Sequence, residues 1–315
     1  MPDSPPESMR AFGLAVPFYR NVALLAEVLQ SIVDQTDRQW RCVVVDDCSP
    51  EEGAAAAVAA LHDERVTYVR NEQRLGIAGN FERCFDVLGT ELALPIVAVV
   101  HSDDLLRADF VQQMRSAHAQ HPEAAAIAGQ VDVIGPDGQA APTLADRVKY
   151  RMWPDRQHVF TMAGEAGLSR ALKGLFWYCP AVSYRLDRLP QLRWDGRWQQ
   201  VMDLDLYGRM LLAGEQLVLW PHEVYRYRRH DATSTSVNTE SLLRFYEEAE
   251  VSDELARAAA ALGWKRAAWS GRLRVASRLH CVLVAVSMLL HRKPRAAVEA
   301  TRLAFSPRAP RRRPR

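Results

Sequence analysis

Apolar residues in the first half of the chain recur at two spacings. Mostly apolar segments of strand length lie at residues 12–16, 41–45, 66–69, 97–100 and 125–134. Apolar positions three or four residues apart, typical of amphipathic helices, lie at residues 21–34, 53–62, 78–88 and 108–119. Strands that alternate with helices in this way predict an α/β fold in which helices flank a mostly parallel central sheet.

The pattern is weaker beyond about residue 140, where tryptophans and prolines are spread through loop-like sequence as far as residue 198. Periodicity returns after that point and predicts helices at 204–212 and 242–262 and a strand at 217–220. Because specificity often resides in loops held by a rigid scaffold, we expect residues 140–198 to determine which substrates are recognised.

Charge is distributed unevenly over the 315 residues, although the formal net charge is only +2. Residues 264–315 hold fourteen Lys and Arg against the single acid Glu299, which leaves −11 for the residues before them. The acidic body and the lack of a recognised motif argue against nucleic acid as a partner. The basic segment interleaves cations with apolar residues, which is typical of a helix at an anionic membrane surface. A helix packed on the rest of the protein with a solvated charged face is an equal alternative.

The cysteines and the apolar segments predict where the protein resides. Five scattered cysteines without a C-x-x-C pair argue against a disulfide framework or a zinc site and favour a reducing cytoplasm. Residues 1–8 contain acids and prolines, unlike a signal peptide. The longest apolar stretch, residues 279–290, is shorter than the roughly 20 residues of a spanning helix. We therefore expect a cytoplasmic protein without a membrane span, whose only membrane attachment is peripheral, at the inner face of the cell membrane.

Pairs of carboxylates follow two of the expected strands. Asp46 and Asp47 come after the second strand, and Asp103 and Asp104 come after the run at 97–100. The carboxyl ends of parallel strands share one edge, where open α/β sheets bind ligands. One such pair is often only a turn or a helix cap. Two pairs at one edge favour a hard divalent cation shared with substrate phosphates, because adjacent buried carboxylates repel each other.

Five ordered motifs in this sequence resemble family 2 glycosyltransferases. They are residues 16–21 (VPFYRN), 43–50 (VVVDDCSP), 71–80 (Asn71 through Gly76 to Asn80), 102–104 (SDD) and 202–206 (MDLDL) followed by Arg209. Their order and spacing match over residues 11 to about 236. The resemblance implies a GT-A type fold and an inverting sugar transfer from a nucleotide-diphospho-sugar with Mn²⁺ or Mg²⁺.

The resemblance also implies a domain organisation. We expect a glycosyltransferase domain with a Rossmann-like nucleotide-sugar-binding half and an acceptor-binding half, followed by a helical extension and flanked by disordered tails. The expected boundaries are 1–10 for the first tail, 11–115 and 116–240 for the two halves, 241–305 for the helical region and 306–315 for the basic tail.

By position in the matching motifs, the resemblance assigns residues to the nucleotide-sugar. Pro17 and Tyr19 would line the base pocket, and Asp47 would accept a hydrogen bond from the base. Asp103 would face the ribose. Arg74 could pair with the nucleotide phosphates, although a lone surface arginine is more often simply solvated.

The remaining assignments concern the metal and the proton. Asp104 would hold the metal in a DXD-like motif, with His230 near the diphosphate or the metal. Asp203 would act as general base toward the acceptor hydroxyl. Asp205, two residues further along, would cap the helix or orient its neighbours. His101 departs from the family, because many members have a third acid at this position, and its effect on metal preference is open.

The sequence therefore predicts an inverting glycosyltransferase with a UDP-type donor. Its acceptor would be a glycan or lipid-linked glycan in cell-surface polysaccharide or glycolipid biosynthesis. A metal-dependent nucleotidyltransferase is one alternative, but it would usually carry a basic glycine-rich loop after its first strand, where residues 16–21 offer only Arg20 and no glycine. A non-catalytic, membrane-associated sugar-nucleotide-binding protein is another, and it would tolerate loss of Asp203.

Overall fold

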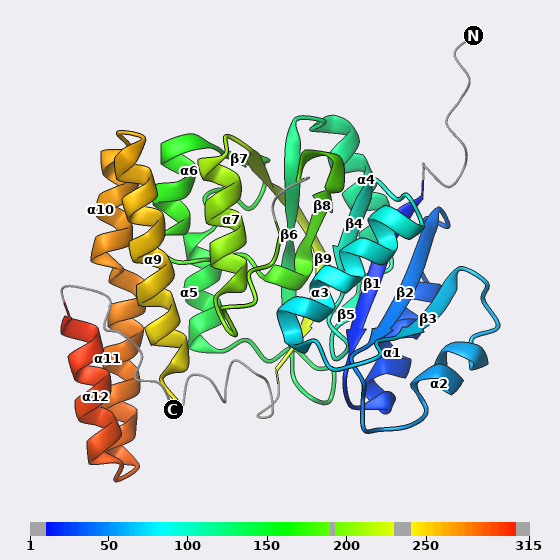
Figure 1. Ribbon diagram of the computed structural model, residues 1–315, viewed down its shortest axis with the longest axis horizontal. Coiled ribbons are helices and arrows are strands. Elements are labelled where there is room, and N and C mark those ends of the chain that lie inside the picture. Colours follow the sequence, from blue (N-terminus) through cyan, green and yellow to red (C-terminus); the bar gives the residue numbers. More distant parts are fainter. Residues whose placement is uncertain (1–10, 190–192, 230–240, 307–315) are drawn as a thin grey trace. The chain divides into compact units, whose positions relative to one another are not determined.

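The computed structural model describes residues 11–189, 193–229 and 241–306 (Figure 1). The chain forms two compact units, each built from several segments. The first consists of Met1–Thr161, Trp177–Gly196 and Gln216–His230, and the second of Met162–Phe176, Arg197–Glu215 and Asp231–Arg315. The expected tails, apart from Ser306, lie outside the described residues, and the expected domain boundaries stay predictions.

The sheet of the first unit runs in the order β3-β2-β1-β4-β8-β6-β9-β5, with β7 paired to β9. Strands β3, β2, β1 and β4 are parallel, whereas β8 is antiparallel to both β4 and β6. Beyond β8, β6 and β9 are parallel and β5 is antiparallel to β9. The strands are β1 Phe12–Phe18, β2 Trp40–Asp46, β3 Val66–Arg70, β4 Ile96–Val99, β5 Leu105–Leu106, β6 Ala124–Ile134, β7 Phe160–Met162, β8 Val182–Arg185 and β9 Gln216–Arg228.

Helices cover both faces of the parallel half of this sheet. The helices of the first unit are α1 Val22–Val33, α2 Ala54–Ala60, α3 Gly76–Asp86, the π-helical turn η2 Val87–Glu91, α4 Phe110–Gln120 and α5 Leu144–Met152, with short 3₁₀ turns η3 Cys179–Ala181 and η4 Leu186–Arg188. Phe12, Leu14 and Val16 of β1 share one core with α1, α2 and α4. Gly13 points the other way, toward Leu88 and the α3 side (Figure 1). Burial of β1 on both faces explains why its sequence is continuously apolar.

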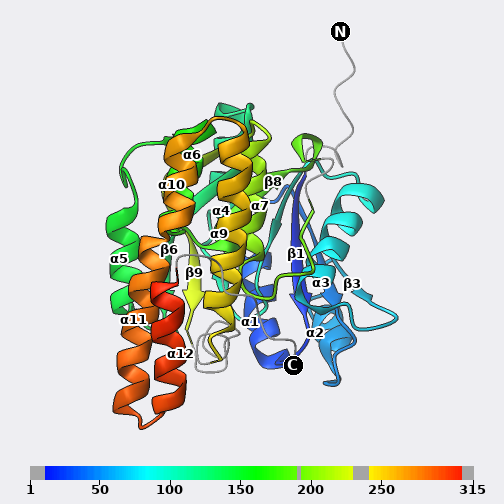
Figure 2. The ribbon, with the colours of Figure 1, turned by 60° about the vertical axis from the view of Figure 1, so that its left-hand side comes forward.

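The second unit is helical. It contains α6 Gly164–Ala171, α7 Met202–Leu212, α9 Leu243–Ala261, α10 Lys265–Leu273, α11 Val275–Leu290 and α12 Pro294–Phe305. Glycines allow α7 and α10 to pack closely against α9. A Cβ at Gly208 of α7 would collide with Leu255 of α9, and one at Gly271 of α10 would lie 2.7 Å from the Ser252 carbonyl oxygen of α9. Helices α11 and α12 lie side by side in both views and share a small core of their own (Figures 1 and 2).

The sequence predictions for the first 134 residues are confirmed to within a few residues. Asn21 caps α1, since its side chain accepts a hydrogen bond from the Leu24 amide at 3.2 Å. The strand expected at 217–220 is instead the 13-residue β9. The segment Lys265–Leu290 is long and apolar enough to span a membrane by length and composition alone. Arg274, with a φ of 46°, divides it into α10 and α11, and the expected absence of a membrane span stays a prediction.

Candidate active site

The candidate site lies at the carboxyl ends of β2, β1 and β4. These strands are neighbours and parallel, so the residues that follow them meet at one edge of the sheet. The chain leaves β1 for β2 and β3 on one side and returns to β4 on the other. Ligands of open α/β sheets bind at such a reversal of strand order.

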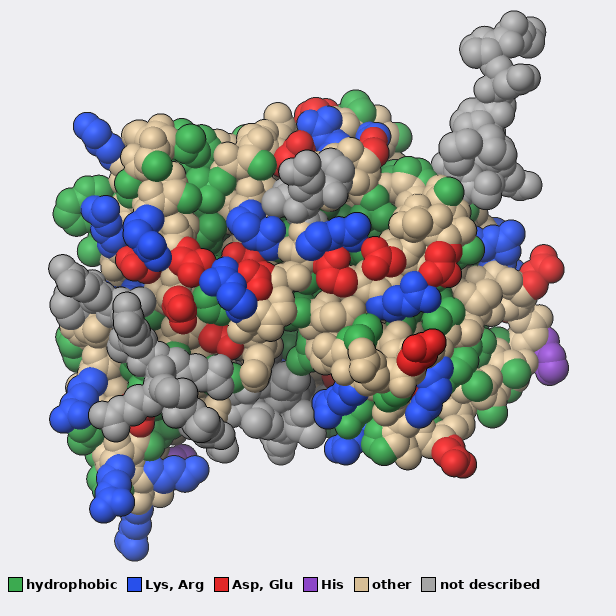
Figure 3. Space-filling model, in the orientation of Figure 1, with side chains coloured by type: hydrophobic (Ala, Val, Ile, Leu, Met, Phe, Trp, Pro, Cys, Tyr) green, Lys and Arg blue, Asp and Glu red, His purple; other side chains and the backbone are tan. Residues whose placement is uncertain are grey.

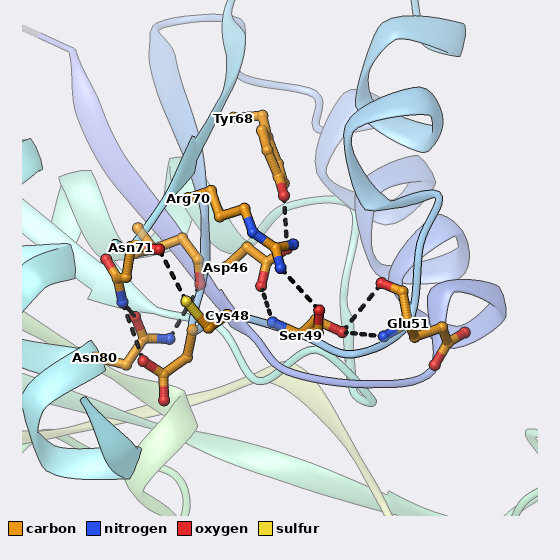
Figure 4. Close-up of polar contacts among 10 residues, drawn as sticks. Asp46, Cys48, Ser49, Glu51, Tyr68, Arg70, Asn71 and Asn80 are labelled. Atoms are coloured by element: carbon orange, nitrogen blue, oxygen red, sulfur yellow. Dashed lines mark hydrogen bonds and ion pairs between the residues drawn. The ribbon is translucent and has the colours of Figure 1, made fainter. Parts of the chain in front are cut away.

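Asp46 is a fully buried anchor below this edge. Its carboxylate accepts hydrogen bonds from the Ser49 amide at 2.6 Å, the Tyr68 hydroxyl at 2.5 Å and the Arg70 guanidinium at 2.9 Å (Figure 4). Burial and the Asp46 carboxylate raise the pKa of Tyr68, so its hydroxyl stays a donor. Arg70 also donates to the Ser49 carbonyl at 3.0 Å. Asp46 therefore fixes the turn that presents the next residue.

Asp47 caps the start of α3. Its two oxygens accept from the amides of Leu75, at 2.6 Å, and Gly76, at 2.9 Å, and from the Asn71 side chain at 3.1 Å. Asn71 in turn donates to Asn80 of α3 (Figure 4). Gly76 has a φ of 76°, which glycine adopts without strain. The helix-cap role considered for the aspartate pairs is thus present at Asp47, and its contact with a base stays a prediction.

Tyr19 and Arg74 are brought together at the mouth of this edge. The Arg74 guanidinium carbon lies 4.0 Å from the centroid of the Tyr19 ring, and that of Arg20 lies 5.1 Å away. Half-buried Pro17 pairs with Val45 in the register of β1 and β2. An aromatic ring beside exposed guanidinium groups suits a base and its phosphates, although none of these roles has been tested.

Asp104 is held from the far end of the sheet. One oxygen accepts from the Arg228 amide at 2.7 Å, and the other accepts from the Tyr225 hydroxyl at 3.0 Å. Arg228 is itself buried and donates to the Asp103 carbonyl at 2.8 Å and to Glu27 at 2.6 Å. Burial, followed by the charge of Asp103, raises the pKa of Asp104 well above its usual range. A cation beside Asp104 would relieve this cost.

His101, Asp103 and Asp104 form a cluster in which one ligand atom from each lies within 4.8 Å of the others. The imidazole Nδ1 of His101 is 3.6 Å from a carboxylate oxygen of Asp104. Burial lowers the pKa of His101, which favours the neutral, metal-binding form of its ring. Ligands around an ion at about 2.1 Å lie about 3–4 Å apart, so a divalent cation fits this donor set after a small closure.

Asp203 and Asp205 lie in the first turn of α7, in the second unit. Buried Asp205 accepts two hydrogen bonds from Arg209, at 2.9 and 2.7 Å, which agrees with an orienting role. Asp203 is only half-buried and accepts from the Leu204 amide at 2.8 Å. Its action as general base stays a prediction, and His230, the expected partner of the metal, lies outside the described residues.

An ion pair follows directly after β9. Arg229 donates two hydrogen bonds to buried Asp146, one of them at 2.8 Å, and Asp146 also accepts from the hydroxyls of Thr143, at 2.6 Å, and Tyr178, at 2.5 Å. Burial raises the pKa of Asp146, but these donors outweigh it and bring the pKa to about 2. The charged pair fixes the backbone at the end of β9.

Comparison with known families identifies the chain. The family described as glycosyl transferase family 2 matches residues 14–174, just over half of the sequence. The chain belongs to this family.

Other proteins resemble this family 2 glycosyltransferase over most of its length. The uncharacterized protein MT1568 of Mycobacterium tuberculosis is 27% identical over 268 residues, which cover 80% of each chain. The structure of S. aureus TarS 1–349 has a TM-score of 0.59 at 16% identity, covering 93% of this chain and 90% of that one. A mannosyltransferase of Pyrobaculum calidifontis, PcManGT, in complex with GDP-Man and Mn²⁺, has a TM-score of 0.57 at 16% identity, covering 93% and 84%. The fold is of the GT-A type.

The structure adds residues that the sequence did not assign to the site of this glycosyltransferase. Tyr225 and Arg228 support Asp104 from β9. His101, noted in the sequence only as a departure from the family, offers a third atom that could bind a metal ion. The tyrosine and arginine alternation of residues 225–228 was visible in the sequence, but nothing in it indicated that this strand meets the aspartates.

Proposed function

We propose that the protein is an inverting glycosyltransferase that moves a sugar from a nucleotide-diphosphate donor, of the UDP type, to a hydroxyl of a glycan or lipid-linked glycan. The observation that carries this proposal is the cluster of His101, Asp103 and Asp104 at the strand edge, next to the Asp47 turn. The solved structures support it, since TarS 1–349 has been obtained with UDP-GlcNAc and PcManGT with GDP-Man and Mn²⁺.

We propose that Asp104, His101 and Asp103 hold Mn²⁺ or Mg²⁺. When bound, such an ion supplies positive charge that neutralises the leaving diphosphate. The support from Tyr225 and Arg228 keeps the Asp104 carboxylate at a fixed position and orientation, which a charge-stabilising site requires. The mixed nitrogen and oxygen donors favour Mn²⁺ over Mg²⁺, because Mg²⁺ prefers oxygen ligands.

The nucleotide part of the donor would bind along the edge from β2 to β4. In this proposal Pro17 and Tyr19 take the base, Arg74 pairs with the phosphates and Asp103 faces the ribose. The exposed guanidinium of Arg74 is available for this, because it is held only against the face of Tyr19 among the contacts described here. Asp47 positions the α3 start, whose glycine allows close approach of a ligand.

Transfer with inversion needs a base that removes the proton from the acceptor hydroxyl. Asp203 is the proposed base by its position in the MDLDL motif of the family, and Asp205, bonded to Arg209, would orient the start of α7. The family match argues against a nucleotidyltransferase. Free cysteines at all five positions are compatible with the proposed cytoplasmic location. The proposed role in making cell-surface polysaccharide or glycolipid rests on the family alone.

A thermal-shift panel of UDP-, GDP- and dTDP-sugars, with and without MnCl₂, tests this function. We expect one nucleotide-sugar to raise the melting temperature in the presence of the metal, because a ligand that binds only the folded state stabilises it. The same donor should then support release of nucleoside diphosphate by the wild type and by Asp132→Asn, a surface variant outside the site. If no nucleotide-sugar shifts the melting temperature, the proposal is wrong.

A further inference from the structure

The outer face of α11 is an apolar stripe. Its large side chains lie at positions 275, 279, 283, 286 and 290, spaced by four, four, three and four residues. At about 100° per residue, this spacing places them within roughly 80° of one another. They are half or more exposed: Val275 61%, Leu279 60%, Leu283 57%, Val286 50% and Leu290 77%.

The opposite face of α11 is already used. Cys281, Ala285 and Met288 are buried against α12, where they form a core with Ala300 and Leu303. An apolar stripe on a helix is normally covered by another apolar surface. The stripe is therefore a surface of this unit that has the composition of an interface.

Basic residues surround the end of the stripe. Leu290 is followed in the turn to α12 by Arg292, Lys293 and Arg295, all exposed. Over residues 265–306 there are nine Lys and Arg against the single acid Glu299. Figure 3 shows Lys and Arg gathered at the end of the α11 and α12 pair.

We propose that α11 and its turn to α12, the α11–α12 hairpin, dock on the surface of an anionic lipid bilayer, with the stripe among the acyl chains and the cations at the headgroups. Apolar side chains flanked by cations suit this surface, where both kinds of group gain free energy together. A second copy of the chain is a poorer occupant, because it would bring two sets of uncompensated cations together.

The helix lies on the bilayer and does not cross it. Arg274, with a φ of 46°, breaks the apolar segment Lys265–Leu290 between α10 and α11. The 16 residues of α11 span about 24 Å, which is less than the roughly 30 Å hydrocarbon core. Its polar side is also tied to the protein, since Ser277 donates to Glu248 of α9 at 2.5 Å and Arg278 donates to the Ser306 carbonyl at 2.9 Å.

Co-sedimentation of the full chain with vesicles tests the docking. We expect at least tenfold stronger binding to phosphatidylcholine vesicles containing 30% phosphatidylglycerol than to pure phosphatidylcholine, weakened by 500 mM NaCl. Leu283→Glu with Leu290→Glu should reduce this binding at least tenfold, whereas Leu144→Glu, at an exposed leucine of α5, should not. Equal binding of the double variant and the wild type overturns the proposal.

Two further measurements exclude other occupants. Light scattering measures the oligomeric state of both proteins. A dimeric wild type and a monomeric double variant, with equal vesicle binding, would show that the stripe binds a second copy. Wild-type protein that resists extraction from membranes by alkaline carbonate would show a span. Circular dichroism and unchanged donor-induced stabilisation confirm that the double variant is folded, and they separate failure of this proposal from failure of the proposed enzyme activity.

Discussion

Replacing Asp104 with Asn distinguishes the contribution of this buried side chain to folding stability from its contribution to metal binding. The variant keeps an oxygen for the Arg228 amide, and the Tyr225 hydroxyl can rotate to accept from the new amide group. It also removes a charge that burial and Asp103 disfavour, as the raised pKa of Asp104 shows. Without metal, we expect the unfolding free energy to change by no more than about 1 kcal/mol.

Asp104→Ala is the contrasting change. It leaves the Arg228 amide and the Tyr225 hydroxyl buried without their acceptor. Each unsatisfied donor costs about 1–3 kcal/mol. This variant should therefore lose roughly 2–5 kcal/mol of stability even without metal.

The stabilisation by the metal follows from the linkage between binding and folding. At a Mn²⁺ concentration 100 times its Kd, the wild type gains about 2.7 kcal/mol, or about 5 °C in Tm for a chain of this length. If Asp104→Asn weakens binding about 100-fold, the same Mn²⁺ concentration gives only about 0.4 kcal/mol, less than about 1 °C. The amide is a weaker ligand because it is neutral.

Scanning calorimetry with and without MnCl₂ measures both effects, with Asp132→Asn as the surface control. A full Mn²⁺-induced shift in Asp104→Asn would show that Asp104 is not a ligand. A metal-free Asp104→Asn protein that is less stable by more than about 2 kcal/mol would refute the reasoning about the buried charge.

Three other predictions concern single residues. Asp146→Ala should cost about 2–4 kcal/mol in urea unfolding, because it removes the acceptor of the buried Tyr178 hydroxyl and leaves half-buried Arg229 without its partner. Burial raises the pKa of Asp146, but its hydrogen-bond donors outweigh burial and lower the pKa to about 2. The charged carboxylate therefore contributes about 1–2 kcal/mol of stability, which is present above about pH 4 and lost toward pH 2. A stability difference between wild type and Asp146→Ala that stays constant from pH 4 to pH 2 would contradict this. His101→Ala should weaken Mn²⁺ binding, followed by electron paramagnetic resonance, about tenfold and Mg²⁺ binding less; unchanged Mn²⁺ binding would exclude a ligand role. Asp203→Asn should keep donor affinity in calorimetry but lower turnover by about 10²–10⁴-fold, and a near-normal rate would refute its role as base.

Much of the parallel half of the sheet could be predicted because each strand there is a short, mostly apolar segment that ends at polar residues. Burial on both faces gives β1 and β2 that pattern, and the aspartates at their ends follow from the same reading. The position of Asp47 at the shared edge was therefore predictable. Its three internal hydrogen bonds were not, because they depend on where the α3 start lies.

The second half of the sheet was harder to predict for a physical reason. β9 contains Pro221, which suggested an end to the strand, yet pairing with β6 continues across irregular register shifts on either side of Gln130. α5 did carry a signal, since Thr143 and Asp146 form a capping box at its start. His101 could not be assigned from sequence, because its role depends on a 3.6 Å distance to Asp104.

The contacts between Asp104 and β9 join positions 121 and 124 residues apart in the chain. During synthesis at about 5–20 residues per second, the aspartates would leave the ribosome roughly 6–24 seconds before Tyr225 does. Throughout that interval the nascent chain carries the acidic motif without its support. The proposed metal site is thus among the last parts of this unit to assemble, and a chain that stops short of β9 would retain the acidic motif of the family without the side chains that hold Asp104.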